Sequence, residues 1–260
     1  MAVLDRFRLN GRRCFVTGGS RGLGREMALA IAEAGADLIL VGRDRPALEA
    51  TGADVERRGR AAVLIQADVS QPLEAERACR TALEHHGPIH ILINNVGGRR
   101  IDVPTENLAL EEWQEVIDLN LTSTFICTKL IGGAMVRRGQ GGRIINVASI
   151  AGLIAARGIA GRSYEASKAA VIQFTRAVAA DWAPHRVTVN AIAPGIFLTE
   201  PNIRWSRLNP ALMAAGKAQI PMGDFGRAED LGPLAVYLAS DASRYMTGAV
   251  LVIDGGYTAW

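Results

Sequence analysis

The sequence predicts an α/β protein in which a doubly wound parallel sheet of seven strands is covered by helices on both faces. Short β-branched apolar runs alternate with longer helical patterns along most of the chain, which is typical of βαβ units. Several runs, such as DLILVG at 37–42, are apolar at nearly every position, so both sheet faces should be covered. Each helical pattern is long enough for a right-handed crossover back to the same sheet.

The predicted strands are short and rich in Val, Ile and Leu, and they are residues 13–17, 37–42, 62–67, 89–94, 142–148, 188–193 and 249–253. The predicted helices have apolar residues at helical spacing, and they are residues 24–34, 46–58, 72–86, 111–138, 163–182 and 228–239. No linker, charge block or internal repeat interrupts the chain. We therefore expect residues 1–260 to form a single domain.

One segment, at about 195–226, departs from this alternation. It contains Pro201, Pro210 and Pro221 among mixed aromatic, basic and apolar residues. A long insertion in a compact domain is usually a lid or binding loop. It follows the carboxyl end of a strand, where open α/β sheets bind ligands, so we predict a substrate loop.

Composition excludes several classes of protein. Of the 260 residues, 49% are hydrophobic and 21% charged, unlike disordered or fibrous chains. The longest uncharged stretches, 144–156 and 187–199, fall well short of the roughly 20 apolar residues of a membrane span. The first residues do not resemble a secretory signal. We expect a soluble cytoplasmic protein without a membrane partner.

Metal and nucleic-acid sites are not predicted. Cys14, Cys79 and Cys127 are widely separated, and the four histidines lack the spacing of metal ligands. The net charge is +3, but the basic residues are scattered among acidic ones, whereas a phosphate backbone requires them on one face. The arginines are therefore interpreted as a solvated surface.

A glycine-rich turn joins the first predicted strand to the first helix. Glycine allows positive φ and close approach of a ligand, and a helix N-terminus offers free N–H groups to a pyrophosphate. A glycine-rich turn alone is a weak signal among 28 glycines, but its position between strand and helix favours a dinucleotide site. The turn consists of Thr17, Gly18, Gly19, Ser20, Arg21, Gly22, Leu23 and Gly24.

The end of the second strand bears on which dinucleotide binds. A carboxylate there favours the ribose hydroxyl of NAD, and an arginine favours the 2′-phosphate of NADP. The strand ends Gly42-Arg43-Asp44. Arg43, with Arg21 as a second cation, favours NADP(H), whereas Asp44 would favour NAD(H) if it faced the ribose.

Tyr164 and Lys168 are four residues apart in a helical pattern, so they share one face. An ammonium near a phenol is expected to lower the phenol's pKa towards the range useful for acid–base chemistry. With four tyrosines and three lysines in 260 residues, chance gives about 0.05 such pairs. A simple helix-surface pair is the alternative, but the spacing favours a catalytic pair.

These motifs, taken in order, resemble the short-chain dehydrogenase/reductase family over nearly the whole chain. The resemblance is carried by 17–24, Asp68-Val69, Asn94-Asn95-Val96-Gly97, Asn120, Ser149, Tyr164 with Lys168, Pro194-Gly195 with Thr199, and Asp254-Gly255-Gly256. It implies an NAD(P)-dependent oxidoreductase on a Rossmann sheet of order 3-2-1-4-5-6-7, commonly a homotetramer.

The resemblance also implies roles for individual residues. Tyr164 is similar to the family's general acid–base, Lys168 to the lysine that lowers its pKa and holds the nicotinamide ribose, and Ser149 to the hydroxyl that binds the substrate carbonyl. Asn120 is similar to an asparagine that anchors a water near Lys168. The residues implied to bind the dinucleotide elsewhere are Asp68 and Val69 at the adenine, Asn95 and Gly97 at the adenosine ribose, and Pro194, Gly195 and Thr199 at the carboxamide.

The sequence departs from the family pattern at three places. Val96 replaces an alanine, the segment 150–163 is two residues longer than usual, and two arginines follow Gly98. Converging positive charge would attract an anionic substrate. The basic residues considered for this are Arg99, Arg100, Arg157, Arg162, Arg204 and Lys217, with solvent exposure as the alternative for each.

The main functional hypothesis is hydride transfer between NADP(H) and a secondary alcohol or ketone. Within the family, the segment from Val41 and the closing residues are most similar to gluconate 5-dehydrogenases and related sugar-acid or polyol reductases. Reduction of a 3-oxoacyl thioester is the alternative substrate class. A non-catalytic dinucleotide-binding sensor is the alternative from another class, although Ser149, Tyr164 and Lys168 are all present.

A homo-oligomer is also predicted. The helical patterns 111–138 and 163–182 carry apolar residues on more than one face, including Phe125 and Phe174. Such helices either pack on a second subunit as well as on their own sheet, or simply cover the sheet of a monomer.

Overall fold

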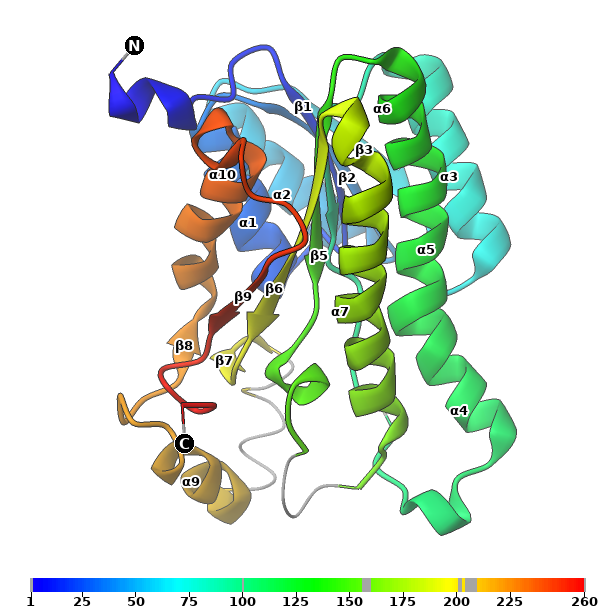
Figure 1. The fold of residues 1–260 in the computed structure, drawn as a ribbon, viewed down its shortest axis with the longest axis vertical. Coiled ribbons are helices and arrows are strands. Elements are labelled where there is room, and N and C mark those ends of the chain that lie inside the picture. Colours follow the sequence, from blue (N-terminus) through cyan, green and yellow to red (C-terminus); the bar gives the residue numbers. More distant parts are fainter. Residues whose placement is uncertain (1, 100, 156–159, 201–202, 204–209, 260) are drawn as a thin grey trace.

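Seven parallel strands form the central sheet in the order β3-β2-β1-β4-β5-β6-β9, which confirms the predicted fold class and order (Figure 1). The computed structural model describes residues 2–99, 101–155, 160–200, 203 and 210–259. The strands are β1 Arg13–Thr17, β2 Asp37–Gly42, β3 Ala62–Gln66, β4 Ile91–Asn94, β5 Gly142–Val147, β6 Val187–Pro194 and β9 Val250–Ile253. The strands that follow β1 in the chain are added on one side of it as far as β3, and β4 begins the other side. The strand order therefore changes direction between β1 and β4, and a crevice is expected at their carboxyl ends.

Helices cover both faces of the sheet (Figure 1). On one face lie α1 Gly22–Glu33, α2 Arg45–Arg57 and α10 Gly232–Ala239. On the other lie α3 Pro72–His85, α4 Leu110–Ile117, α5 Ser123–Cys127, α6 Gly133–Arg138 and α7 Ser163–Trp182. Short 3₁₀ turns occur at Val3–Phe7, Thr105–Asn107, Ile150–Gly152, Ala183–His185, Ala228–Leu231 and Asp241–Ser243.

The strands are mostly apolar because both faces of the sheet contribute to a core. In β2, Leu38 and Leu40 pack with α1, whereas Ile39 and Val41 pack with α3 on the opposite side. All four side chains are at most 1% exposed. Period-two alternation therefore directs neighbouring residues into different cores, as expected for a parallel sheet between helical layers.

The segment predicted as one helix at 111–138 is instead three α-helices joined by two π-helical turns. The turns span Asp118–Thr122 and Thr128–Gly132. By length and composition, Leu110–Arg138 is also the one helix of the described part of the chain apolar enough to cross a membrane. Of its most apolar window, 56% is buried and α5 packs against α3, as in a core helix of the fold.

The segment 195–226 contains regular structure that the sequence analysis missed. β7 Phe197–Leu198 and β8 Gly226–Arg227 form a separate two-stranded parallel sheet. Along the chain, α9 Pro210–Ala218 comes between these two strands. The segment is tied to the turn after β9, where Met222 N–H donates to the Gly255 carbonyl (3.1 Å). Gly255 and Gly256 have positive φ (65° and 88°), as this turn requires.

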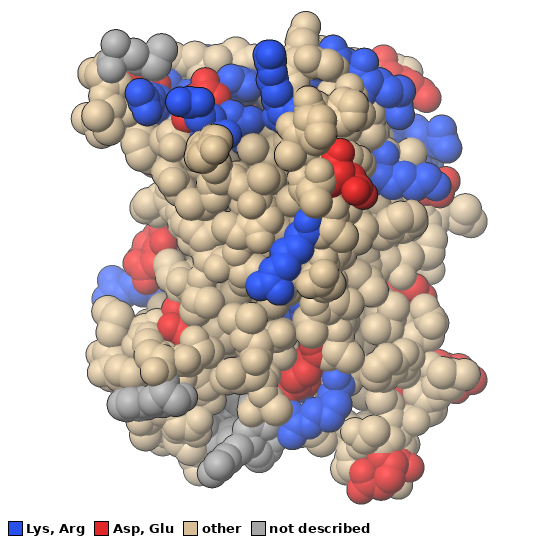
Figure 2. Space-filling model, in the orientation of Figure 1, with Lys and Arg blue, Asp and Glu red and all other residues tan. Residues whose placement is uncertain are grey.

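Charge is unevenly distributed over the face seen in Figure 2, where Lys and Arg gather at the end carrying the N-terminus. That end holds the loops preceding the strands. The middle of the same face is largely uncharged. The carboxyl ends of the strands, where the predicted site residues lie, are at the opposite end of the molecule.

Candidate functional site

The turn between β1 and α1 has an open backbone because side chains are sterically excluded from it. Gly18 and Gly22 have positive φ, of 66° and 57°. A Cβ built on Gly24 would lie 2.2 Å from the Gly18 carbonyl oxygen, so α1 packs directly against the turn. The first N–H groups of α1 point out of this turn without intrahelical partners. This is the cradle that a pyrophosphate requires.

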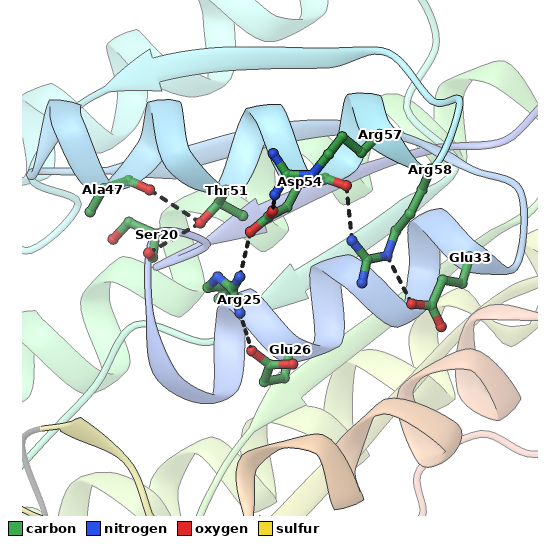
Figure 3. Close-up of polar contacts among 9 residues, drawn as sticks. All are labelled: Ser20, Arg25, Glu26, Glu33, Ala47, Thr51, Asp54, Arg57 and Arg58. Atoms are coloured by element: carbon green, nitrogen blue, oxygen red, sulfur yellow. Dashed lines mark hydrogen bonds and ion pairs between the residues drawn. The ribbon is translucent and has the colours of Figure 1, made fainter.

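The turn is supported from α2 (Figure 3). The buried Thr51 hydroxyl lies 3.2 Å from the Ser20 carbonyl oxygen and 3.1 Å from that of Ala47. One helical turn further, the Asp54 carboxylate pairs with the guanidinium groups of Arg25 on α1 and Arg57 on α2. Hydrogen bonds and ion pairs thus fix α2 relative to the first turn of α1.

A cavity of about 350 Å³ lies beside this turn. Asn95, after β4, closes one side: its Nδ2 donates to the carbonyl oxygens of Thr17 (3.2 Å) and Gly18 (3.3 Å). Ala67 and Leu119 add apolar surface. The lining includes eight of the predicted dinucleotide-binding residues, namely Gly18, Ser20, Arg21, Arg43, Asp68, Val69, Asn95 and Gly97. The cradle, the cavity and these donors fit the adenosine and pyrophosphate part of a dinucleotide.

At the end of β2, acidic groups hold the two predicted cations. Arg43 Nη1 lies 3.3 Å from Asp68 Oδ2, and its side chain is 59% exposed. Asp44 accepts from Ala47 N–H (3.1 Å), which caps α2, and also pairs with Arg21. Asp44 therefore has structural partners for both carboxylate oxygens, and Arg43 is the more exposed group.

Asp68 is held in its charged form. Burial raises the pKa of its carboxyl, but hydrogen bonds from Ser70 and the Arg43 guanidinium outweigh burial, so the pKa lies below the usual value. The Ser70 hydroxyl donates at 2.7 Å and its N–H at 3.0 Å. Asp68 is thus an oriented acceptor at the rim of the cavity.

The predicted catalytic residues meet at the carboxyl ends of β4 and β5. Lys168 is 3% exposed, and its Nζ donates to the Val147 carbonyl oxygen (2.8 Å) and lies 5.9 Å from the Tyr164 ring centroid. Ser149 forms a side-chain hydrogen bond with Tyr164. A Cβ on Gly97 would lie 2.7 Å from both Asn120 Oδ1 and Lys168 Nζ, so Gly97 is where these groups converge.

Asn120 lies in the first π-helical turn and is fully buried. Its Oδ1 accepts from Gly98 N–H (3.0 Å) while its Nδ2 donates to the carbonyl oxygens of Gly98 (3.0 Å) and Val116 (2.9 Å). π-Helical turns occur frequently at functional sites. The side chain therefore fixes the loop after β4 beside Lys168.

The pKa of Tyr164 differs from the expectation. Burial is the largest effect and leaves the phenol's pKa above its ordinary value; the Ser149 hydrogen bond and the Arg99 guanidinium pull it down, and Glu165 raises it. Burial also lowers the pKa of Lys168 to about 8. The net lowering expected for the phenol is therefore not found, because burial outweighs the groups that favour the phenolate; of the two cations at the ring, Arg99 lies closer than Lys168.

The residues predicted for the carboxamide region lie between the glycine turn and the chain after β9. A Cβ on Gly22 would lie 3.5 Å from the Thr199 methyl carbon, so Thr199 closes over the turn. A Cβ on Gly195 would lie 2.7 Å from Asp254 Cα. Pro194 ends β6 beside Ile253. Leu23 is partly buried and packs on the core under α1.

The basic residues considered for an anionic substrate have acidic partners where the structure describes them. Arg99 and Arg162 both pair with Glu165, and Lys217 pairs with Asp224 (3.3 Å). Arg100, Arg157 and Arg204 lie outside the described residues. The contact of Arg99 with Glu165 and with the Tyr164 ring was missed, because nothing in the sequence indicated that the loop after β4 meets the start of α7.

Among the described residues, no group of three His, Cys, Asp or Glu side chains is placed to hold a metal ion. The three cysteines are buried and free. Desolvation raises the pKa of Cys14 well above its ordinary value, so this thiol stays protonated in the core.

The known proteins that this chain is similar to are dehydrogenases and reductases. The family model described as Enoyl-(Acyl carrier protein) reductase matches residues 18–258. The chain is 40% identical to galactitol 2-dehydrogenase (L-tagatose-forming) of Cereibacter sphaeroides, over 98% of each chain. It is 38% identical to a 3-oxoacyl-[acyl-carrier-protein] reductase of Synechocystis sp., over 95% of this chain and 97% of that one. It is 39% identical to 2-dehydro-3-deoxy-D-gluconate 5-dehydrogenase of Bacillus subtilis, over 97% of each.

Solved structures have the same fold over the same length. A short-chain type dehydrogenase/reductase from Mycobacterium marinum matches with a TM-score of 0.90 and 38% identity, covering 100% of both chains. A 3-oxoacyl (acyl-carrier-protein) reductase from Agrobacterium tumefaciens C58 with NADP bound matches with a TM-score of 0.91 and 30% identity, covering 99% of this chain and 98% of that one.

Proposed function

The chain belongs to the short-chain dehydrogenase/reductase family, and from this premise we propose that it interconverts a secondary alcohol and a ketone with NADP(H). It is an NAD(P)(H)-dependent oxidoreductase. The observation that carries the proposed chemistry is the contact of Ser149 with Tyr164, with Lys168 on the same helix and its Nζ beside Gly97, which lines the cavity next to the glycine turn.

Each residue of the site is proposed to have a separate role that follows from its position. The bound nicotinamide supplies or accepts the hydride. Tyr164 Oη gives a proton to the developing alkoxide during reduction and takes it back during oxidation. Ser149 Oγ donates a hydrogen bond to the same substrate oxygen and so stabilises its negative charge. The buried Lys168 ammonium holds the ribose hydroxyls, and Asn120 keeps the loop after β4 in place beside it.

The first turn of α7 assists Tyr164. The phenol belongs to the second residue of this helix, which begins at Ser163. The partial positive charge of a helix N-terminus stabilises a negative group in its first turn. This position is therefore proposed to offset part of the effect of burial, which leaves the pKa of the phenol above its ordinary value.

A preference for NADP(H) over NAD(H) is proposed from the charges at the rim of the cavity. Arg43 is exposed beside Asp68, and Arg21 lies across the glycine turn. A 2′-phosphate brings about two negative charges to these guanidinium groups, which match phosphate geometry. Asp44 is already used as the cap of α2, which weakens the case for a carboxylate at the ribose.

The proposed substrates are sugar acids or polyols. Relatives at 35–40% identity are named for galactitol, gluconate and 2-dehydro-3-deoxy-D-gluconate. A 3-oxoacyl thioester is the second candidate, because a relative at 38% identity is a 3-oxoacyl-[acyl-carrier-protein] reductase. The segment 195–226 is proposed to cover the substrate, since it is anchored at β8 and at the turn after β9.

The test is a screen of purified protein with both NADPH and NADH. Galactitol, gluconate and their keto products are compared with acetoacetyl thioesters, following cofactor absorbance. We expect turnover of a sugar acid or polyol with NADP(H). Faster turnover of the thioesters would replace the substrate class, and cofactor binding without turnover on a broad carbonyl panel would contradict the proposed chemistry.

We further propose a cytoplasmic homotetramer. Phe125 on α5 is 46% exposed and stacks edge-to-face with Phe174 on α7 at 6.2 Å. Val252 on the edge strand β9 is 43% exposed. Exposed apolar faces of this kind are typical of subunit contacts. Light scattering on the eluted protein measures the mass, and a monomer would contradict the proposal.

A further inference from the structure

Arg99 lies in the loop after β4, and its guanidinium stacks on the Tyr164 ring. The Cζ atom is 4.9 Å from the ring centroid, and the side chain is 22% exposed. A cation over an aromatic face is attracted by the ring's electron density, and the attraction strengthens when the contact is shielded from water. Arg99 therefore contacts the residue proposed to move the proton.

The guanidinium is fixed by four acceptors. Its Nη1 donates to Glu165 Oε2 (2.9 Å) and to the carbonyl oxygens of Ala160 (2.9 Å) and Gly161 (3.2 Å), while Nη2 donates to Glu165 Oε1 (2.8 Å). The paired bonds to Glu165 are the bidentate geometry that arginine makes and lysine cannot. The Glu165 side chain is 12% exposed, so the pair is shielded from water and salt.

The backbone holds the same two segments together. Gly161 N–H donates to the Val103 carbonyl (2.9 Å), and Ala160 N–H donates to Asp102 Oδ1 (2.8 Å). Gly161 has a φ of 73°, and a Cβ there would lie 2.2 Å from the Ile101 carbonyl oxygen. These contacts therefore hold the loop that carries Arg99 against the first turn of α7, which carries Tyr164.

We propose that Arg99 is a positioning residue for Tyr164: clamped by Glu165 and the carbonyls before α7, its guanidinium holds the phenol ring and stabilises the phenolate. The proposal rests on the acid–base role proposed for Tyr164. It also assigns Arg99 a role other than binding a substrate carboxylate, since Glu165 and a backbone carbonyl already accept from its two Nη atoms.

Several groups face Tyr164, and their effects oppose one another. Arg99 and the Ser149 hydroxyl favour the phenolate, whereas Glu165 and burial disfavour it. Lys168 lies on the same helix face, with Nζ 5.9 Å from the ring centroid. Two further charged groups lie next to these residues: Arg162 pairs with Glu165, and Asp102 accepts a hydrogen bond from Ala160 N–H. Arg99 and Glu165 thus have opposite electrostatic effects on Tyr164 although they bind each other.

This opposition gives a test that a merely structural role would not satisfy. The titration of Tyr164 is followed by tyrosinate absorbance, as the difference between each variant and the same variant carrying Tyr164→Phe. Arg99→Gln is expected to move the Tyr164 midpoint to higher pH, and Glu165→Gln to lower pH. Arg99→Lys keeps the charge without the bidentate fork, so its midpoint should lie between those of wild type and Arg99→Gln.

Arg58→Gln is the matched control, because Arg58 pairs with Glu33 (2.8 Å) at the far end of α2 and should leave the midpoint unchanged. If Arg99→Gln does not fold, the Glu165→Gln midpoint still decides. The proposal is wrong if Arg99→Gln and Glu165→Gln move the midpoint in the same direction, or if a folded variant of either leaves it where wild type has it.

Kinetics then link the titration to turnover. In the direction of alcohol oxidation, below the Tyr164 midpoint, Arg99→Gln should lower kcat about tenfold, the size expected from removing an opposite charge at this range. Cofactor affinity should stay within twofold. The absorbance titration needs no substrate, so it can test the role of Arg99 even if the substrate screen finds no turnover.

Discussion

The ammonium of Lys168 donates a hydrogen bond to the carbonyl oxygen of Val147, the last residue of β5, at 2.8 Å. This contact fixes a buried cation at the carboxyl end of a central strand. Gly97 and Asn120 approach it from the other side. The lysine is thereby held by the sheet itself, independently of the substrate loop.

Replacing Tyr164 by Phe removes the proposed proton donor while keeping the ring under Arg99. General acid–base groups typically contribute about 10²–10⁴-fold to rate, so kcat should fall by at least that much. NADPH affinity, measured by fluorescence titration, should change less than threefold. Tyr245→Phe, at a side chain 98% exposed, is the control. Retention of most activity in Tyr164→Phe would exclude the proposed role.

Replacing Lys168 by Met should change how stability depends on pH. Burial lowers the pKa of Lys168 from 10.5 to about 8. Below pH 8 the lysine is charged in both states, so the folded state carries a penalty of roughly 3 kcal/mol. Between pH 8 and 10.5 the unfolded chain binds more protons, and the penalty disappears as pH rises.

Lys168→Met carries no such penalty at any pH. Its advantage in unfolding free energy over wild type should therefore be largest near pH 7 and shrink through pH 8–10.5, apart from a constant offset for the lost hydrogen bond. Urea unfolding across this range measures the difference. The exposed Lys129→Met should show no such trend. An advantage that grows with pH would contradict the assignment.

Arg43→Ala tests the choice of cofactor. Losing one guanidinium from a 2′-phosphate site should weaken NADPH binding by about tenfold or more, the equivalent of one charge-assisted hydrogen bond. NADH affinity should change little. Arg45→Ala is the matched control, since Arg45 pairs with Glu49 on the outside of α2. Equal losses for both cofactors would place Arg43 away from the 2′ position.

Gly97→Ala tests the convergence of Asn120 and Lys168. A methyl group there would lie 2.7 Å from both polar atoms, so one must move. We expect a loss of stability of about 1–3 kcal/mol, as for overpacked sites, with a more than tenfold loss of kcat. Gly133→Ala, in α6, should be neutral or stabilising because alanine favours helix. An unchanged kcat in Gly97→Ala would contradict the geometry.

Thr51→Val tests the support of the glycine turn. Valine keeps the shape but removes the donor to the Ser20 carbonyl. We expect about 1 kcal/mol lower stability and weaker binding of both cofactors alike. Thr51→Ser restores the hydroxyl and should recover most of the affinity. A specific effect on NADPH alone would argue against a role in the turn.

The strands and most helices were predictable from the sequence because the signals are local. Runs such as residues 37–42 are apolar at nearly every position, and this pattern has few interpretations in a chain of alternating strands and helices. The glycine turn was predictable for the same reason. The structure adjusts strand ends by one or two residues, as at β4, which begins at Ile91 rather than residue 89.

Non-local contacts were not predictable. The stack of Arg99 on Tyr164 joins residues 65 positions apart, through a loop whose path depends on Gly161. The pKa of Lys168 depends on burial that no local pattern reports. The pairing of β7 with β8 rests on two residues in each strand, too few for a period to appear. Contacts between residues far apart in the sequence could therefore not be predicted before the fold was known.

The two π-helical turns between Leu110 and Arg138 have a consequence for insertions and deletions. A π-helical turn holds one residue more than an α-helical turn, so each rotates everything beyond it by about 100° relative to an unbroken helix. Removing one residue next to Asn120 would restore an ordinary helix with the same ends. It would also turn either Asn120 away from Gly98, or Phe125 away from Phe174, so the segment is expected to tolerate substitution far better than a change in length.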